Sequence, residues 1–346
     1  MQKILLFIAS LFYFNFLFSK NEIKSWQGIH ETPLSRLEQQ FAEPPVEFAN
    51  HVIWGWEGKM DKKTICNDLD SIKKKGFRAV IFEAGYKLPF KYLSEEWFKA
   101  IRTGVVEAKK RDMKVWIIDE GKYPSGFAGG KFSQERPDLR MQALVIGDTI
   151  QIKRGEVMTN HKIAPEIISA VAVSTSGAPN RTVEINNGKI SFNAGLDDWK
   201  ILLVKSDFRT AVTRAVNNPN GGKDATNSLC DYLNPVAVQQ FIDWTHKQYK
   251  KYLGKELGTT VLGFRGDEPD YAHLPWTPSI VQTFKDTKGY DPTPYLASFF
   301  YRFAYHTGTK SKSRLLGCLV QLVCHPLFQI TSRLVCSQWS SPYYPS

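Results

Sequence analysis

Two pairs of adjacent carboxylates occupy similar positions in this 346-residue chain. Asp119 and Glu120 directly follow the apolar run 115–118. Asp267 and Glu268 follow a second apolar stretch, "VLGF". Acid–base catalysis by carboxyl groups needs one that donates a proton and one that accepts a proton, and neighbours on one strand project to opposite sides, so one pair cannot supply both roles. We therefore expect the catalytic carboxyls to be Glu268, as general acid, and Glu120.

Glu120 precedes a turn-rich loop, residues 121–130, that contains four glycines. This loop differs from a phosphate-binding loop, because Ser125 stands where the first glycine is required and Phe132 follows Lys131. The sequence thus argues against nucleotide binding and predicts that loop backbone passes close to the acid site. A second role for Glu120, organising this loop, stays open beside a role toward substrate or metal.

Four further residues are candidates for substrate binding: Trp56, Glu57, Asp119 and Asp267. An indole can stack on a sugar ring, although the alternation around Trp56 also fits core packing. Glu57 could contact substrate or metal, and Asp267 could instead hydrogen-bond to loop backbone.

The elements that must position these residues alternate along the chain. Expected strands cover 51–56, 78–85, 114–119 and 260–266, and expected helices include 61–76, 94–112 and one long helix over 234–254. Strand–helix alternation with short connections indicates an α/β fold with a parallel sheet, whose carboxyl ends gather ligands. Ser94 is a plausible N-cap.

The alternation is interrupted by short segments typical of antiparallel β structure, with a hairpin expected at "NNG". The expected organisation is a signal peptide at 1–19, an extended lead-in at 20–48, a first part of a barrel at 49–141, an inserted β domain and linker at 142–227, a continuation of the barrel at 228–300, and an atypical tail at 301–346.

The N-terminus has the pattern of a secretory signal: Lys3, an apolar run over 4–18, and the small Ser19. We expect cleavage, a secreted or periplasmic protein and no stable membrane span, with an uncleaved anchor as the alternative. The net charge of +11 does not predict nucleic-acid binding, because residues 292–346 hold five Lys/Arg and no carboxylate, which leaves +6 spread over the rest.

Four stretches resemble glycoside hydrolase family 106, the α-L-rhamnosidases: "PPVEFANHVIWGW", "VWIIDEGKYPSGFAGGKFSQERPDLR", "DYLNPVAVQQFIDWTHKQY" and "GFRGDEP". The resemblance covers roughly residues 40–300. It implies a partial (β/α)8 barrel of the TIM type, an inverting reaction on rhamnose-containing oligo- or polysaccharides, and a calcium ion in the sugar site. Hard oxygen ligands suit calcium, whereas the histidines lack the paired spacing of a zinc site; the metal ligands themselves stay open.

The chain departs from this family in two ways. About four of eight βα units are present, and the tail lacks acids and regular periodicity. A change of reading frame near residues 300–310 would explain both, and an unusual but genuine tail is the alternative. We therefore expect a truncated hydrolase with weak or no activity, or an inactive or carbohydrate-binding remnant of one.

Overall fold

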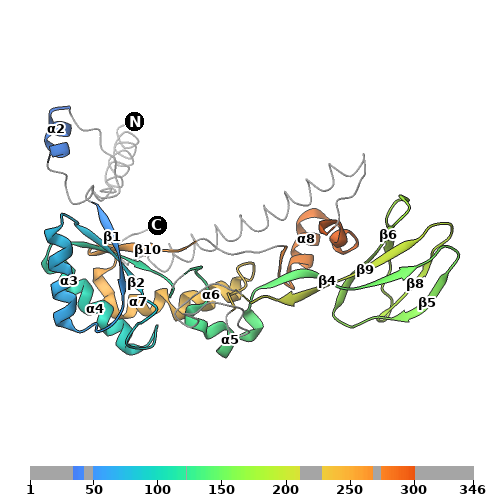
Figure 1. The fold of residues 1–346 in the computed structure, drawn as a ribbon, viewed down its shortest axis with the longest axis horizontal. Coiled ribbons are helices and arrows are strands. Elements are labelled where there is room, and N and C mark those ends of the chain that lie inside the picture. Colours follow the sequence, from blue (N-terminus) through green and yellow to red (C-terminus); the bar gives the residue numbers. More distant parts are fainter. Residues whose placement is uncertain (1–33, 43–49, 122, 211–227, 268–273, 301–346) are drawn as a thin grey trace, which may run out of the picture.

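The computed structural model describes residues 34–42, 50–121, 123–210, 228–267 and 274–300. They form an elongated molecule, with a parallel α/β body at one end and an antiparallel β body at the other (Figure 1). Between the two bodies lie the short helix α5 (Lys131–Glu135) and helix α6 (Pro235–Trp244).

The α/β body is built on a four-stranded parallel sheet of order β1-β2-β3-β10. Its strands are β1 (His51–Trp56), β2 (Ala79–Ala84), β3 (Lys114–Ile118) and β10 (Val261–Arg265). The prediction that these four segments are neighbours in one parallel sheet is confirmed. Among the described strands the sheet is open, so the fold shown is mixed α/β, without closure into a barrel.

Helices α3 and α4 of this body begin at side-chain caps. Helix α3 (Lys62–Lys74) starts at Asp61, which accepts a hydrogen bond from the backbone N–H of Thr64. Helix α4 (Glu95–Lys110) starts at Ser94, as predicted, and acids occupy its first turn. Within the described ranges, each helix is too short or too polar to cross a lipid bilayer.

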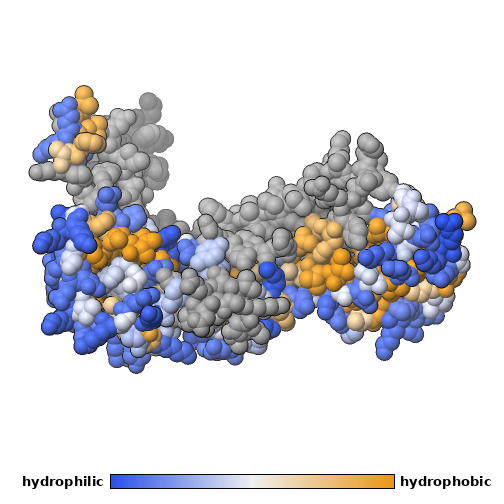
Figure 2. Space-filling model, viewed as in Figure 1, coloured by the Kyte–Doolittle hydropathy of each residue, from blue (hydrophilic) through white to orange (hydrophobic). Residues whose placement is uncertain are grey.

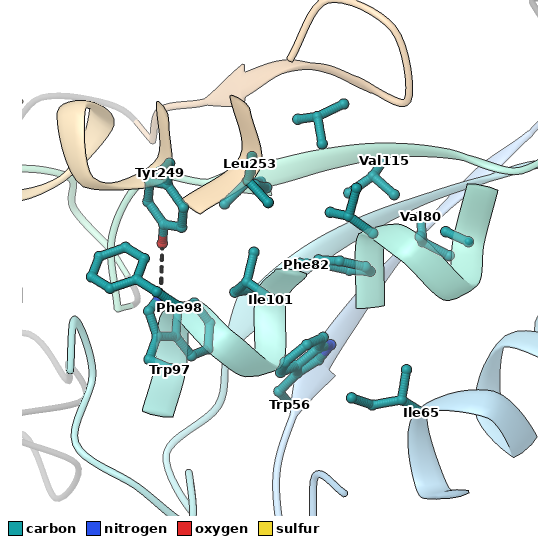
Figure 3. Close-up of a cluster of buried hydrophobic side chains, with 14 of the residues drawn as sticks. Trp56, Ile65, Val80, Phe82, Trp97, Phe98, Ile101, Val115, Tyr249 and Leu253 are labelled. Atoms are coloured by element: carbon teal, nitrogen blue, oxygen red, sulfur yellow. Dashed lines mark hydrogen bonds between the residues drawn. The ribbon is translucent and has the colours of Figure 1, made fainter. Parts of the chain in front are cut away.

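One face of the parallel sheet packs on α3, α4 and α7 (His246–Leu253) around an aromatic core. Trp56 and Phe82 from the strands meet Trp97 of α4, with ring centroids of Trp56 and Trp97 5.7 Å apart. Trp97 Nε1 donates to the Tyr249 hydroxyl at 2.9 Å, which joins α4 to α7 (Figure 3). Burial of these rings supplies the main stabilisation of the body.

The segment 234–254 forms two helices instead of the one long helix expected. The break falls at Thr245, whose φ and ψ of −114° and −87° are not helical and whose Oγ donates to the carbonyl of Phe241. A hydroxyl bound to the carbonyl four residues back competes with the helical ladder. The break turns α7, and with it His246, toward the end of β10.

The antiparallel body confirms the β unit predicted after residue 142. It contains a five-stranded sheet of order β11-β4-β9-β6-β7 and a two-stranded sheet, β5-β8. The strands are β4 (Gln142–Ile152), β5 (Val157–Lys162), β6 (Ile167–Ser174), β7 (Arg181–Val183), β8 (Lys189–Asn193), β9 (Trp199–Phe208) and β11 (Pro275–Trp276).

The turn expected at "NNG" joins β7 to β8. Asn186 and Lys189 exchange backbone hydrogen bonds of 2.8 and 3.0 Å around Asn187 and Gly188, both at positive φ. Positive φ at both central residues is what a tight hairpin turn requires.

Two predicted boundaries are wrong. Residues 274–300 do not continue the parallel sheet: β11 pairs with β4, and α8 (Ile280–Lys288) packs through Ile280 on the antiparallel sheet. Figure 2 shows the apolar surface gathered in two places, on the α/β body and beside α8. Residues 34–42 of the expected extended lead-in form helix α2 (Leu34–Ala42). The signal peptide, the linker over 217–227 and the tail lie outside the described residues.

Replacement of Tyr249 by Phe tests the link between α4 and α7. It leaves the fully buried indole N–H of Trp97 without its acceptor, so we expect the free energy of unfolding to fall by about 1–3 kcal/mol. Urea denaturation measures the change. The matched control is Tyr252→Phe on the same helix, which loses a hydroxyl from a half-buried ring; equal losses in the two variants would contradict the assignment.

Candidate active site

Asp267 lies beside the Asp119–Glu120 pair, where β3 and β10 end side by side. The backbone N–H of Asp119 donates to the carbonyl of Arg265 at 3.1 Å, and a Cβ placed on Gly266 would lie 3.5 Å from Asp119 Oδ2. Parallel neighbours in register therefore bring residues nearly 150 positions apart to one edge of the sheet. Glu268, the predicted general acid, lies outside the described residues, directly after Asp267.

Glu120 is enclosed by the loop that follows it. The residue is 1% exposed. Its Oε1 accepts from the backbone N–H groups of Gly121 and Gly129, at 2.7 and 3.1 Å. Its Oε2 accepts from those of Ala128 and Gly126, at 2.6 and 3.3 Å. Both oxygens are thus committed to backbone donors, and the structure assigns Glu120 to organising the loop.

The prediction that Glu120 is catalytic is accordingly withdrawn, because a carboxyl buried behind four backbone donors has no oxygen left for substrate. Burial raises the pKa of Glu120 to about 7, while the hydrogen bonds from Gly121, Gly129 and Ala128 favour the ionised form and limit this rise.

Two glycines let the loop close around Glu120. Gly126 has a φ of +126°, and a Cβ there would lie 2.6 Å from the Tyr232 hydroxyl. Gly129 has a φ of +63°, and a Cβ there would lie 3.0 Å from the ring of Tyr92. Side chains at either position would meet both backbone strain and a fixed aromatic ring. The glycines therefore serve close packing around a carboxylate, where the sequence suggested close approach to a ligand.

Ser125, which the sequence reasoning did not select, ties the two strand ends together. Its Oγ donates to Asp119 Oδ1 at 2.7 Å and accepts from the backbone N–H of Asp267 at 2.9 Å. Its carbonyl accepts from the Tyr232 hydroxyl. The only sequence signal for this bridge was the position of a hydroxyl in a loop between two acid pairs.

Asp119 is a second carboxyl of this site whose surroundings alter its protonation. It is 8% exposed, and burial raises its pKa to about 6, with a further contribution from the nearby carboxylate of Asp267. The hydrogen bond from Ser125 opposes the rise. A carboxyl with a pKa near 6 can hold a proton in mildly acidic solution and release it near neutrality.

His246, at the break between α6 and α7, faces the other oxygen of Asp119. Its Nε2 lies 3.8 Å from Asp119 Oδ2, and its Nδ1 lies 2.9 Å from the Thr245 hydroxyl. Because that hydroxyl donates to the carbonyl of Phe241, it accepts from Nδ1, which assigns the ring proton to Nδ1 and leaves Nε2 unprotonated.

Burial lowers the pKa of His246 to about 4, so the ring is neutral when Asp119 titrates. Although serine, aspartate and histidine converge here, the arrangement is not that of a serine nucleophile, because Ser125 contacts Asp119 and not the imidazole.

The remaining predicted residues divide between core and rim. Trp56 is fully buried against Phe82 and Trp97, so it is withdrawn as a substrate-binding residue. Glu57 is exposed at the end of β1 and accepts from the backbone N–H of Tyr86 at 3.2 Å. Asp267 is half-buried beside Arg265, whose guanidinium lies 3.8 Å away.

The described residues do not by themselves fit a calcium ion. They contain no cluster of three or more histidine, cysteine or acidic side chains able to hold a metal. Asp119 Oδ1 is already bonded to Ser125, and six or more oxygens are normally required.

The chain is similar in sequence and in fold to proteins named as glycoside hydrolases. Residues 160–303 match the family model of glycoside hydrolase family 106, α-L-rhamnosidase, which confirms the resemblance seen in the sequence. A curated protein named a putative beta-glucuronidase, from Formosa agariphila, is 23% identical and is matched over 76% of this chain. A solved structure of a rhamnosidase from Novosphingobium sp. PP1Y superposes with a TM-score of 0.51 at 13% identity, over 78% of this chain, which shows a shared fold.

The chain spans only part of these relatives. It covers 26% of the Formosa protein and 43% of the Novosphingobium chain. The family match begins within β5 and runs through β6–β9, α6, α7, β10 and α8, so it does not include Asp119 and Ser125.

Glu120→Gln tests whether Glu120 organises the loop. A carboxamide places an NH2 group against backbone N–H donors that need an acceptor, so we expect a loss of about 2–4 kcal/mol in the free energy of unfolding. Limited proteolysis should also cleave within 121–130 faster. Glu135→Gln, which removes an exposed pair with Lys131, is the control and should change stability little. A Glu120→Gln protein as stable as the control would refute the role.

The raised pKa of Asp119 predicts a pH dependence of stability. The neutral form is favoured in the folded state, so its stabilisation is complete below the unfolded pKa, near 3.8, and is lost as the pH rises through about 6. Glu120 and Asp231, whose pKa values are also raised by burial, act in the same direction.

In the native protein the free energy of unfolding should therefore decrease between pH 4 and 6. In Asp119→Asn this decrease should be smaller by about 2–3 kcal/mol, which corresponds to a pKa shift of about two units. Urea denaturation at pH 4, 5, 6 and 7 measures it. An unchanged slope in this variant would show that Asp119 titrates normally.

Proposed function

We propose that this chain is the amino-terminal part of an exported, inverting glycoside hydrolase of the α-L-rhamnosidase type, acting on rhamnose-containing glycans. The observation that carries the proposal is the meeting of Asp119 and Asp267 over the Ser125 bridge, at the carboxyl ends of adjacent parallel strands. That edge is where α/β folds of this kind place catalytic groups.

The architecture supports a partial (β/α)8 barrel. Four parallel strands carry their helices on one face, and the solved rhamnosidase shares the fold. In such a barrel the opposite face is the interior, and the strand ends that carry Glu57, Asp119 and Asp267 form the catalytic rim.

The chemistry follows from an inverting mechanism. One protonated carboxyl donates to the leaving oxygen while a second carboxylate, roughly 6.5–9.5 Å away, removes a proton from the attacking water. Glu268 remains the proposed general acid, since it follows Asp267 at the bridged strand end. Asp119 replaces Glu120 as the second carboxyl that handles a proton, because burial raises its pKa to about 6 and its carboxyl, unlike that of Glu120, is not enclosed by four backbone N–H donors.

An inactive or carbohydrate-binding remnant is the second candidate. Among the described strands, β1 and β10 each pair on one side only, so the sheet has two open edges. Such a remnant would bind a sugar at the carboxyl ends of the strands without hydrolysing it.

Hydrolysis of 4-nitrophenyl α-L-rhamnoside by the 346-residue chain tests the proposal. We expect slow turnover, and proton NMR should show that the first sugar product has the inverted anomeric configuration. We expect no turnover of 4-nitrophenyl β-D-glucuronide, the substrate type that the name of the Formosa relative suggests. Faster cleavage of the glucuronide would move the substrate assignment to glucuronides. Saturable rhamnose binding without turnover would favour the remnant, and neither binding nor turnover would overturn the proposal.

Variants assign the carboxyls. Glu268→Gln should lower the rate by a factor on the order of 100 or more, the scale of general-acid catalysis, and Asp119→Asn should shift the pH profile as well as the rate. Glu135→Gln should leave both unchanged. Calcium remains a proposal drawn from the family resemblance, and a loss of rate after chelation that added calcium restores would support it. An unaffected rate in Glu268→Gln would show that the general acid is another residue.

A further inference from the structure

A hollow lies on the outer helical layer, away from the acid site. It has a volume of about 290 Å³ and is formed by α4, the end of α7 and the turn Gly254–Glu256. The two helices lie side by side on the sheet (Figure 1). Because α4 runs back toward the start of β3, and residues 254–256 precede β10, the hollow is at the amino end of the sheet.

The hollow is strongly basic. Arg102, Lys251 and Lys255 line it, and none of the three pairs within 4 Å with a described carboxylate. The single acid in the lining, Glu256, is already neutralised: it accepts from Lys109 Nζ at 2.9 Å and from the Thr260 hydroxyl at 2.7 Å. Three cations therefore line the hollow without a direct ion pair to a described carboxylate, and Lys255 is near enough to Glu256 to help lower its pKa.

The wall between these cations is apolar and aromatic. Val105 and Leu253 are buried beneath it, and Val106 is exposed at its margin. The Tyr252 ring is held by stacking on Phe98, with centroids 5.0 Å apart and planes 12° apart, and Lys251 Nζ lies over the ring, 5.6 Å from its centroid. The edge of this fixed ring and the neighbouring aliphatic side chains offer apolar contact to a sugar, whereas the cations suit a carboxylate or sulfate substituent.

We propose that this hollow, which we call the basic groove (Arg102, Val106, Lys251, Tyr252 and Lys255), is an auxiliary binding site for an acidic sugar unit of a polysaccharide. Its size is near the lower end of pockets that enclose a small ligand, so it holds one ring of a longer chain. Such a site would keep an anionic polysaccharide on the enzyme while the acid site at the other end of the sheet cleaves a different linkage. The binding function is separate from turnover.

Calorimetric titration with trigalacturonate at low salt tests the groove. The triple variant Arg102→Gln, Lys251→Gln, Lys255→Gln should weaken binding at least 10-fold, and Tyr252→Ala should weaken it with the charges intact. The control removes the same net charge from the exposed face of α3, through Lys63→Gln, Lys74→Gln and Lys75→Gln, and should change binding less than 2-fold.

The neutral trisaccharide maltotriose should not bind. Equal weakening by the two triple variants would show attraction by net charge alone and overturn the groove. Absence of trigalacturonate binding, or equal binding of maltotriose, would also overturn it. None of these outcomes depends on rhamnosidase activity.

Discussion

The hydrogen bonds around Glu120 are the constraint on which the site depends. A buried carboxylate needs compensation, and here four backbone N–H groups of one loop supply it. The loop can make those bonds only if it curls back on the end of β3, with glycines where it meets Tyr232 and Tyr92. Glu120 thus fixes the path of the chain from residue 121 to residue 130.

That path places Ser125 between the carboxyl ends of β3 and β10, and the Ser125 hydroxyl links these two strand ends. One hydroxyl bonded to Asp119 and to the backbone of Asp267 holds β10 and β3 in a fixed geometry at their carboxyl ends. Asp119 is then enclosed by Ser125 on one oxygen and a neutral His246 beyond the other. Burial at this strand end is the main cause of the raised pKa of Asp119, and the hydrogen bond from Ser125 limits the rise.

The sequence was sufficient to predict the parallel sheet, because apolar runs alternate with capped helices at spacings that leave few alternatives. It was also sufficient for the antiparallel unit and the Asn187–Gly188 turn. It could not show which of two adjacent acids is enclosed by the loop. Asp119 and Glu120 give the same sequence signal, and only the path of the loop backbone distinguishes their surroundings. His246 was missed because its role depends on a helix break that the amphipathic pattern of 234–254 conceals. The packing of α8 on the antiparallel sheet was missed because helical periodicity does not say which sheet a helix covers.

The most direct test of this account is the titration of the Asp119 side chain itself, followed by the 13Cγ chemical shift in selectively labelled protein. The account predicts a pKa of about 6 in the native chain. In Ser125→Ala the carboxyl loses the hydrogen bond that favours its ionised form, so its pKa should rise further. An Asp119 pKa near 4 in the native chain, unchanged in the variant, would contradict the central claim that the loop organised by Glu120 holds Asp119 as a buried carboxyl able to carry a proton.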